Sequence, residues 1–166
     1  MRTTLPERVT VAPDFVFMRA KLSRWIAFGL GSGLSSVAPG TVGTLAAWAI
    51  WVLAAPLVPD PSVRAAIIAL AFAAGVWACG RAAEDLGVAD HGAIVWDEIV
   101  AFWLVLAFTP DGFGWQFAAF LLFRFFDIVK PWPIRLADQR LRNGFGVMAD
   151  DLLAALYTMA LVALFR

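Results

Sequence analysis

The chain has 166 residues, of which 61% are hydrophobic and 16% are charged, and its mean hydropathy is +0.78. A soluble domain has about 45–50% apolar and about 25% charged residues, so this composition indicates a membrane protein. Thirteen basic residues balance thirteen acidic ones, so the composition has no signature of a nucleic-acid-binding protein. Cys79 is the only cysteine in the sequence, so no disulfide forms within the chain.

A charged segment precedes the first apolar run. It has no long apolar core before Trp25, which distinguishes it from a cleavable signal peptide. We interpret residues 1–24 as an N-terminal cytosolic arm, with an amphipathic helix through Phe15–Ile26. Residues 25–166 are expected to form a membrane-embedded helical domain.

Five mostly apolar runs predict an all-α fold, a compact multi-helix membrane bundle. The runs are Thr41–Val58, Val63–Gly80, Ala93–Phe108, Trp115–Val129 and Asp150–Phe165. Runs of roughly 15–18 residues reach about 22–27 Å at 1.5 Å per residue, whereas a hydrocarbon core is about 30 Å thick. We therefore expect about five short transmembrane or membrane-embedded helices, with a broken Gly/Ser-rich segment near the N-terminal side.

The distribution of basic residues predicts an orientation. If the N-terminal arm is cytoplasmic, the Arg81–Gly92 and Pro131–Gly146 loops fall on the same side. The second of these loops contains Arg135, Arg140 and Arg142, which agrees with the positive-inside rule. The same alternating path of the helices across the membrane brings five carboxylates to cytoplasmic helix ends: Asp97, Glu98, Asp127, Asp150 and Asp151.

Carboxylates at apolar helix ends are costly unless they are paired, metal-bound or open to water. Three such placements in one small chain suggest a single polar site. Asp97 and Glu98 are adjacent and would point about 100° apart on a helix, so one is expected to bind an ion and the other to support it or carry a proton. The alternative is an ordinary helix start, where acidic residues suit the helix dipole.

Two further acidic groups lie beside cations or glycines. Arg124, Asp127 and Lys130 have the spacing of one helix face, which suits a site for a metal and a phosphate. Their alternative is a structural ion pair with snorkelling cations. Asp150 and Asp151 follow a glycine-rich stretch at the expected start of a helix, where capping is the alternative role.

The Gly/Ser-rich stretch Gly29–Thr44 can present N–H groups and hydroxyls to an anion. Close packing of helices through small residues explains its composition equally well. His91 is the only histidine in the sequence. A single loop histidine is most often incidental, but its place six residues before Asp97 makes it a candidate phosphate or proton contact.

Four segments, taken together and in this order, closely resemble the phosphatidylglycerophosphatase A family. They are GSGLSSVAPGTVGTLAAW, GVADHGAIVWDE, FRFFDIVKPWPIRLADQ and GFGVMADDLLA. The resemblance extends from about Gly29 to Tyr157, and its specificity comes from the joint occurrence of the motifs.

The resemblance implies an integral enzyme of the bacterial inner (cytoplasmic) membrane. The apolar runs and the distribution of basic residues add the expectation that it is multi-pass, with its active site facing the cytoplasm. The resemblance further implies Mg²⁺-dependent removal of the terminal phosphate of phosphatidylglycerophosphate, a phospholipid substrate, to give phosphatidylglycerol. Oxygen ligands suit Mg²⁺, and the sequence has no Cys/His cluster for zinc. Attack by water and a covalent aspartyl-phosphate both remain open.

We assign expected roles to the candidate residues on this basis. Catalytic roles are expected for Asp97, Asp127, Asp150, Asp151 and Lys130. Metal binding is expected for Asp97, Glu98, Asp127, Asp150 and Asp151. Phosphate binding is expected for Ser32, Ser35, Thr41, Thr44, His91, Arg124, Lys130 and Arg135. The expected partners are the lipid bilayer and the substrate lipid.

Two other functional classes are compatible with parts of the sequence. A small ion-coupled transporter also has intramembrane carboxylates and a glycine-broken helix, but its charged site belongs near the membrane midplane, and here the acidic groups thread to one face. A non-catalytic helical lipid-binding or soluble binding protein is compatible with the short apolar runs.

Overall fold

The computed structural model describes residues 13–88, 91–136 and 143–166, and these contain no strand. The expected all-α fold is confirmed. The helices are α1 (Phe15–Arg19), α2 (Leu22–Ala27), α3 (Pro39–Ala54), α4 (Pro61–Leu86), α5 (Trp96–Phe108), α6 (Phe113–Val129) and α8 (Gly144–Phe165), with the 3₁₀ helices η1 (Gly29–Leu34) and η2 (Ala55–Leu57).

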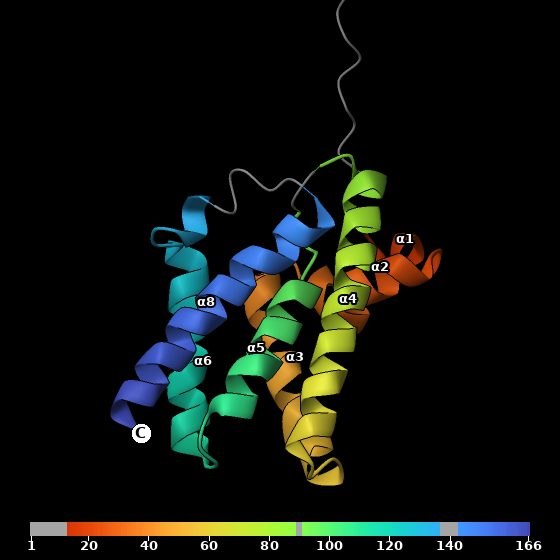
Figure 1. Ribbon diagram of the computed structural model, residues 1–166. Helices are drawn as coiled ribbons and strands as arrows, with labels where there is room; N and C mark the ends of the chain where they lie inside the picture. Colours follow the sequence, from red (N-terminus) through yellow and green to blue (C-terminus); the bar gives the residue numbers. More distant parts are fainter. Residues whose placement is uncertain (1–12, 89–90, 137–142) are drawn as a thin grey trace, which may run out of the picture.

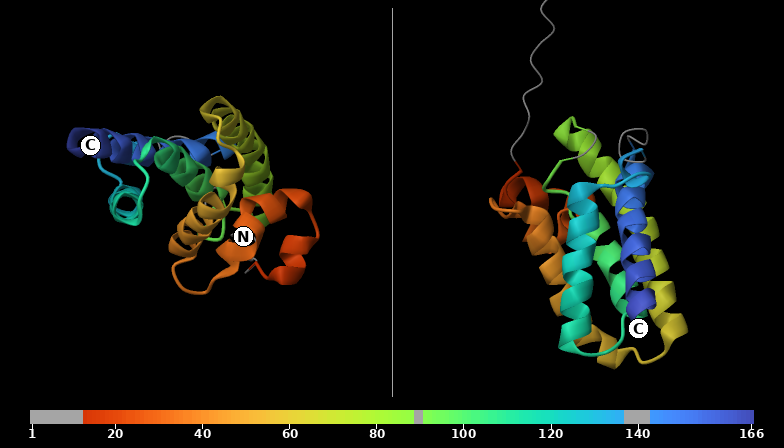
Figure 2. Two further views of the ribbon diagram at one scale, coloured as in Figure 1. Left: turned by 90° about the horizontal axis from the view of Figure 1, so that it is seen from below. Right: turned by 90° about the vertical axis from the view of Figure 1, so that its left-hand side faces the viewer.

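Helix α5 lies at the centre of the bundle. It packs against α3, α4, α6 and α8, and the right-hand view of Figure 2 shows it behind α6 and α8, which lie side by side. A helix that is apolar on all sides is stable only when it is surrounded. Phe102 and Val105 are accordingly fully buried.

Helices α4 and α8 approach closely where both carry glycine. A Cβ atom on Gly144 would overlap the carbonyl oxygen of Val76 and would lie 2.8 Å from the backbone nitrogen of Gly80. Small residues allow such backbone contact between helices in membranes. This contact fixes the position of the start of α8, and the helix then packs against α5.

Two helices are longer than the sequence predicts. Helix α4 has 26 residues and α8 has 22, which corresponds to about 39 Å and about 33 Å. The expectation of short helices is therefore wrong for this pair. Asp60 caps α4 ahead of the apolar run, and charged residues in the last turns, such as Arg81, do not end a helix.

Three of the described helical segments are long and apolar enough to cross a membrane: Pro39–Leu57, Pro61–Leu86 and Gly144–Phe165. Helices α5 and α6, with 13 and 17 residues, are shorter than the about 30 Å hydrocarbon core. The bundle thus combines spanning helices with shorter embedded ones.

The expected single helix through Phe15–Ile26 is wrong. The backbone is extended at Lys21 (φ −144°, ψ 140°) and separates α1 from α2. Arg24 donates a hydrogen bond from Nε to Asp85 Oδ2 at 2.9 Å and another from Nη1 to the carbonyl oxygen of Phe17 at 2.9 Å. These bonds fasten α2 to α4 close to the boundary proposed between arm and domain, a division that stays a prediction.

The Gly/Ser-rich segment is irregular, as expected. Positive φ values occur at Leu30 (56°), Gly31 (106°) and Ala38 (45°). Ala38 is the N-cap of α3, and Pro39 is the first residue of that helix, a position that proline favours. The segment therefore leads directly into the first turn of α3.

Four helix ends meet at one end of the molecule. The N-termini of α3, α5 and α8 and the C-terminus of α6 lie at the end that carries α1 and α2, in the upper half of Figure 1. The α3–α4 connection, the α5–α6 turn and the C-terminus lie at the other end.

Candidate active site

A cavity of about 240 Å³ lies where these helix ends meet. The structure brings all five predicted carboxylates to its wall. Its lining residues are Ala38, Pro39, Gly40, Gly92, Ile94, Asp97, Glu98, Arg124, Asp127, Lys130, Asp150 and Asp151. Segments far apart in the sequence thus form one acidic site.

Three carboxylates from three helices form a group that can hold a metal ion. One oxygen each of Glu98 (α5), Asp127 (α6) and Asp151 (α8) lie within 4.8 Å of one another. We call these residues the acidic triad. Asp151 is only 3% exposed, and its Oδ2 atom has no hydrogen-bond partner within the described part of the chain. A buried carboxylate oxygen without a partner is costly, and a cation at the triad would remove that cost.

Arg124 connects the triad to α3. Its Nη1 atom lies 2.9 Å from Glu98 Oε1, 2.7 Å from Asp127 Oδ2 and 3.3 Å from Thr44 Oγ1. Thr44 is fully buried and donates its own hydroxyl proton to the carbonyl oxygen of Gly40. The ion pair considered as an alternative role for Asp127 is present, and it orients two members of the triad.

Lys130 reaches the cavity by a route that differs from the prediction. Helix α6 ends at Val129, and Lys130 has a left-handed backbone conformation (φ 44°) as its C-cap. It therefore does not continue the helix face of Arg124 and Asp127. Its Nζ atom lies 2.5 Å from Asp150 Oδ2, so this cation contacts α8.

Asp150 and Asp151 do not cap α8. Helix α8 begins at Gly144, and the side chain of Asn143 accepts the hydrogen bond from the Gly146 nitrogen. Asp150 is the seventh residue of α8, about two turns from its start. The capping interpretation is thus wrong, and both carboxylates point from inside a helix into a shared polar site, which indicates a role other than helix capping.

The charges at the cavity do not balance among the lining side chains. Among the described residues, five carboxylates face two cations, Arg124 and Lys130, an excess of three negative charges when all are ionised. A phosphate monoester would be repelled by this field unless cations neutralised it. The arrangement therefore suits a divalent metal ion followed by an anionic ligand, with the N-terminus of α3 adding a favourable dipole.

Other predicted phosphate contacts lie outside the cavity wall. The predicted residues absent from the lining are Ser32, Ser35, Thr41, His91 and Arg135, and Thr44 lies behind Arg124. Ser32 donates to the Gly29 carbonyl oxygen at 2.8 Å, and Ser35 donates to that of Val37 at 2.9 Å. His91 Nδ1 accepts from the Ala93 nitrogen at 3.1 Å. The side chains of Ser32, Ser35 and His91 thus form hydrogen bonds with backbone atoms two or three residues away in the sequence.

Sequence reasoning missed the contact between Gly40 and Glu98. A Cβ atom on Gly40 would overlap Glu98 Oε1, so the glycine makes room for a triad carboxylate. The sequence signal was Ala38-Pro39-Gly40, in which proline marks the first turn of a helix. Gly40 and Pro39 belong to the cavity wall.

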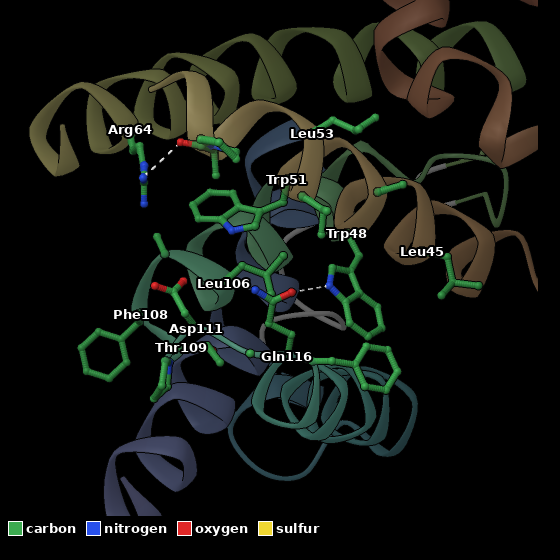
Figure 3. A pocket seen from close by; sticks show the side chains of 18 of the residues that line it. Leu45, Trp48, Trp51, Leu53, Arg64, Leu106, Phe108, Thr109, Asp111 and Gln116 are labelled. Atoms are coloured by element: carbon green, nitrogen blue, oxygen red, sulfur yellow. Dashed lines mark hydrogen bonds between the residues drawn. The ribbon is translucent and has the colours of Figure 1, made fainter. Parts of the chain in front are cut away.

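A larger cavity of about 1290 Å³ lies at the opposite end of the bundle. Figure 3 shows its mostly apolar wall, which includes Trp48, Trp51 and Leu106. Trp48 Nε1 donates to Gln116 Oε1 at 2.6 Å inside it. The clustered carboxylates are absent from its lining, so the acidic cavity is the candidate active site.

Fold and site define an α-helical membrane protein with a buried acidic cavity that can hold a metal ion beside two cations. Residues 25–166 match the family described as phosphatidylglycerophosphatase A. The chain belongs to this family, which confirms the resemblance seen in its motifs.

Curated relatives support this assignment. A phosphatidylglycerophosphatase A of Haemophilus influenzae is 49% identical over 82% of this chain and 84% of its own length. The phosphatidylglycerophosphatase A of Escherichia coli is 39% identical over 96% and 92%. A putative phosphatidylinositol-3-phosphatase of Bacteroides thetaiotaomicron is 41% identical over 85% and 91%. No solved structure matches the chain significantly.

Proposed function

We propose that the protein is a Mg²⁺-dependent phosphatidylglycerophosphatase of the bacterial cytoplasmic membrane. It removes the terminal phosphate of phosphatidylglycerophosphate and leaves phosphatidylglycerol and inorganic phosphate. The observation that carries this proposal is the acidic triad beside Arg124 and Lys130, in a chain whose relatives include enzymes named for this reaction.

The triad fits Mg²⁺ by the chemistry of its ligands. Glu98, Asp127 and Asp151 offer only carboxylate oxygens, which Mg²⁺ prefers together with several waters. The described residues of the cavity wall include neither histidine nor cysteine, the ligands typical of zinc. A bound divalent ion supplies charge that polarises the phosphoryl group and orients water.

Arg124 and Lys130 stabilise the charge of the phosphate. Positive groups aimed at phosphoryl oxygens act most strongly in a site that excludes water. The contacts of Arg124 with Glu98 and Asp127 hold its guanidinium in one orientation. Its Nε atom is buried and has no hydrogen-bond partner among the described residues, so it is our candidate donor to a phosphate oxygen.

The two remaining carboxylates have separate roles in this proposal. Asp150 pairs with Lys130 and thereby positions that cation. Asp97 lines the same cavity outside the triad, and it is our candidate general base for the attacking water.

The proposed orientation places the acidic cavity on the cytoplasmic side. Arg19, Lys21 and Arg81 lie on α1, on the segment before α2 and near the C-terminal end of α4, at the end of the bundle that carries the cavity. Basic residues concentrate on the cytoplasmic side of membrane proteins. Arg140 and Arg142, which contributed to the same prediction, lie outside the described residues.

The name of the Bacteroides relative makes phosphatidylinositol 3-phosphate the competing substrate. Purified protein in detergent micelles is supplied with Mg²⁺ and either lipid, and phosphate release is measured. We expect a higher kcat/KM for phosphatidylglycerophosphate. A preference for phosphatidylinositol 3-phosphate would reassign the substrate. Release from neither lipid by protein with an intact melting transition would refute the phosphatase proposal.

A further inference from the structure

An apolar groove of about 430 Å³ extends from the acidic site between α4, α5 and α8. Its walls include Ile68 and Phe72 of α4, Leu104 of α5 and Leu152 of α8. Asp97 lines both this groove and the acidic cavity. A polar site and an apolar groove thus share one wall, which is the arrangement that an amphiphilic ligand requires.

We propose that this groove holds one acyl chain of the phospholipid substrate while its phosphate lies in the acidic cavity. The proposal rests on the proposed function and adds the part of the site that recognises the lipid tail. The acyl chain in the groove and the phosphate in the cavity belong to one substrate molecule, because the groove starts at the wall of the cavity that takes the phosphate.

Small side chains create the groove. Ala65 and Ala69 of α4 and Ala101 and Ala107 of α5 line it, where larger residues would fill the space between the helices. Ala65, Ala69 and Ala107 are exposed. The groove is therefore open along the outer surface of the bundle, so a chain can enter sideways from the surrounding lipid.

The groove runs from the acidic cavity to the opposite end of the bundle, where α4 begins at Pro61. The ten-residue step from Asp97 to Ala107 along α5 corresponds to about 15 Å. Arg64 lines the far end. Its guanidinium donates to the carbonyl oxygens of Val58 and Ala55 at 2.5 and 3.1 Å, so a polar, hydrogen-bonded side chain ends the apolar surface there.

The groove contributes mainly by positioning the substrate. Lipid tails are as apolar as leucine side chains, so moving a chain from the bilayer into the groove gains little hydrophobic free energy. A chain held beside Asp97 does, however, fix where its headgroup lies, and a correctly placed reacting group is worth far more than binding alone. Filling the groove should lower kcat/KM for long-chain substrates and spare short-chain ones.

Ala69→Phe fills the groove, and Ala66→Phe is its matched control. Both alanines are exposed on α4 and lie three residues apart, but only Ala69 lines the groove. Phosphate release is measured from phosphatidylglycerophosphate with hexanoyl or palmitoyl chains at constant detergent. We expect Ala69→Phe to lower kcat/KM at least about 10-fold for the palmitoyl lipid only, as small changes in apolar pockets do. Ala66→Phe should behave like the unsubstituted protein.

A binding measurement separates the groove from turnover. Phosphatidylglycerol with a photoreactive diazirine in one chain is crosslinked to each protein, and adducts are mapped by mass spectrometry. We expect adducts on groove residues of α4 and α5 in the unsubstituted protein and the Ala66→Phe variant, and their loss in Ala69→Phe. Melting temperatures confirm that each variant is folded.

Equal chain-length profiles for the Ala69→Phe and Ala66→Phe variants would overturn the groove while leaving the phosphatase intact. An equal loss on both chain lengths would also overturn the groove, since the effect of Ala69→Phe would then not depend on the length of the acyl chain.

If the unsubstituted protein hydrolyses neither lipid, the proposed function itself fails. In the crosslinking experiment, adducts spread evenly over the lipid-facing surface would overturn the groove independently of turnover.

Discussion

The position of the Glu98 carboxylate is constrained from two helices, α6 and α3. Arg124 Nη1 lies 2.9 Å from its Oε1 atom, and Gly40 leaves the space that this oxygen occupies. Adjacent Asp97 instead lines the cavity outside the triad. Two neighbouring acids on one helix therefore have different surroundings, and we expect them to differ in function.

Replacement of Asp127 separates metal binding from structural ion pairing. We expect Asp127→Asn to abolish turnover, to lower Mg²⁺ affinity by about 10-fold or more, by analogy with losses at residues that support metal ligands, and to leave the protein folded. Phosphate release is measured beside thermal melting in detergent, and the dependence of the melting temperature on Mg²⁺ reports the affinity of the inactive variant. Asp111→Asn, at the exposed α5–α6 turn, makes the same charge change away from the cavity and should have no effect.

The opposite pattern would give Asp127 a structural role. If it only neutralised Arg124, its loss would leave a buried cation without its partner and cost about 3–5 kcal/mol of stability. A lowered melting temperature with near-normal turnover would contradict the assignment of Asp127 to the triad.

Single residues show where sequence reasoning was sufficient. The five carboxylates and two cations were identifiable because charged groups are costly inside apolar runs. Which member of each acidic pair joins the triad was not, because adjacent helical side chains diverge by about 100° and only helix packing decides which one faces the cavity. Lys130 was misplaced because its left-handed backbone conformation gives no periodic signal.

Helix α3 contacts α5 through glycines at its start. A Cβ atom on Gly40 would meet Glu98, and one on Gly43 would lie 2.8 Å from Val95 Cβ. Both glycines face the first turn of α5 or the residue before it. The contact between these helices therefore sets the position of a triad ligand.

Gly40→Ala should damage the site through this contact. Its Cβ would displace the Glu98 carboxylate, so we expect a higher Mg²⁺ requirement and a lower kcat. Gly114→Ala is the matched control, because Gly114 is also the second residue of its helix and has nothing within 4 Å of its Cβ position. That variant should keep full activity. Equal activity of the two variants at limiting Mg²⁺ would show that Glu98 tolerates displacement.

The five helices of the bundle were predictable from the apolar runs, and their ends were not. Five apolar runs correspond to α3, α4, α5, α6 and α8. Helix α8 starts six residues before its apolar run because Asn143 caps it and Gly144 fits against α4. Such starts depend on caps and on tertiary contacts, which hydropathy does not record.

The two ends of the whole molecule differ in chemistry. The cavity, α1 and α2 lie at one end, and the wide apolar cavity of Figure 3 lies at the other. The sequence predicted that the carboxylates meet at one end because antiparallel helices alternate direction. It did not predict the apolar groove, which depends on the crossing of α4 and α8 over α5.

The orientation in the membrane is tested by cysteine accessibility. Cys79 is fully buried and is replaced by alanine, and one cysteine is introduced at Val88 or at Asp111. We expect an impermeant thiol reagent to label the Asp111→Cys protein in intact spheroplasts, and the Val88→Cys protein only after permeabilisation. Labelling of Val88→Cys from outside would reverse the proposed topology.

A Mg²⁺ titration of phosphate release tests the proposed mechanism most directly. Chelator-treated protein in detergent micelles is given phosphatidylglycerophosphate, and initial rates are measured as Mg²⁺ is added. We predict no release without the ion, saturable activation by Mg²⁺, and a shift of the activation midpoint to at least about 10-fold higher Mg²⁺ in Glu98→Gln. Full activity of the chelated protein, or an unchanged midpoint in Glu98→Gln, would contradict a metal-dependent phosphatase site at the acidic triad.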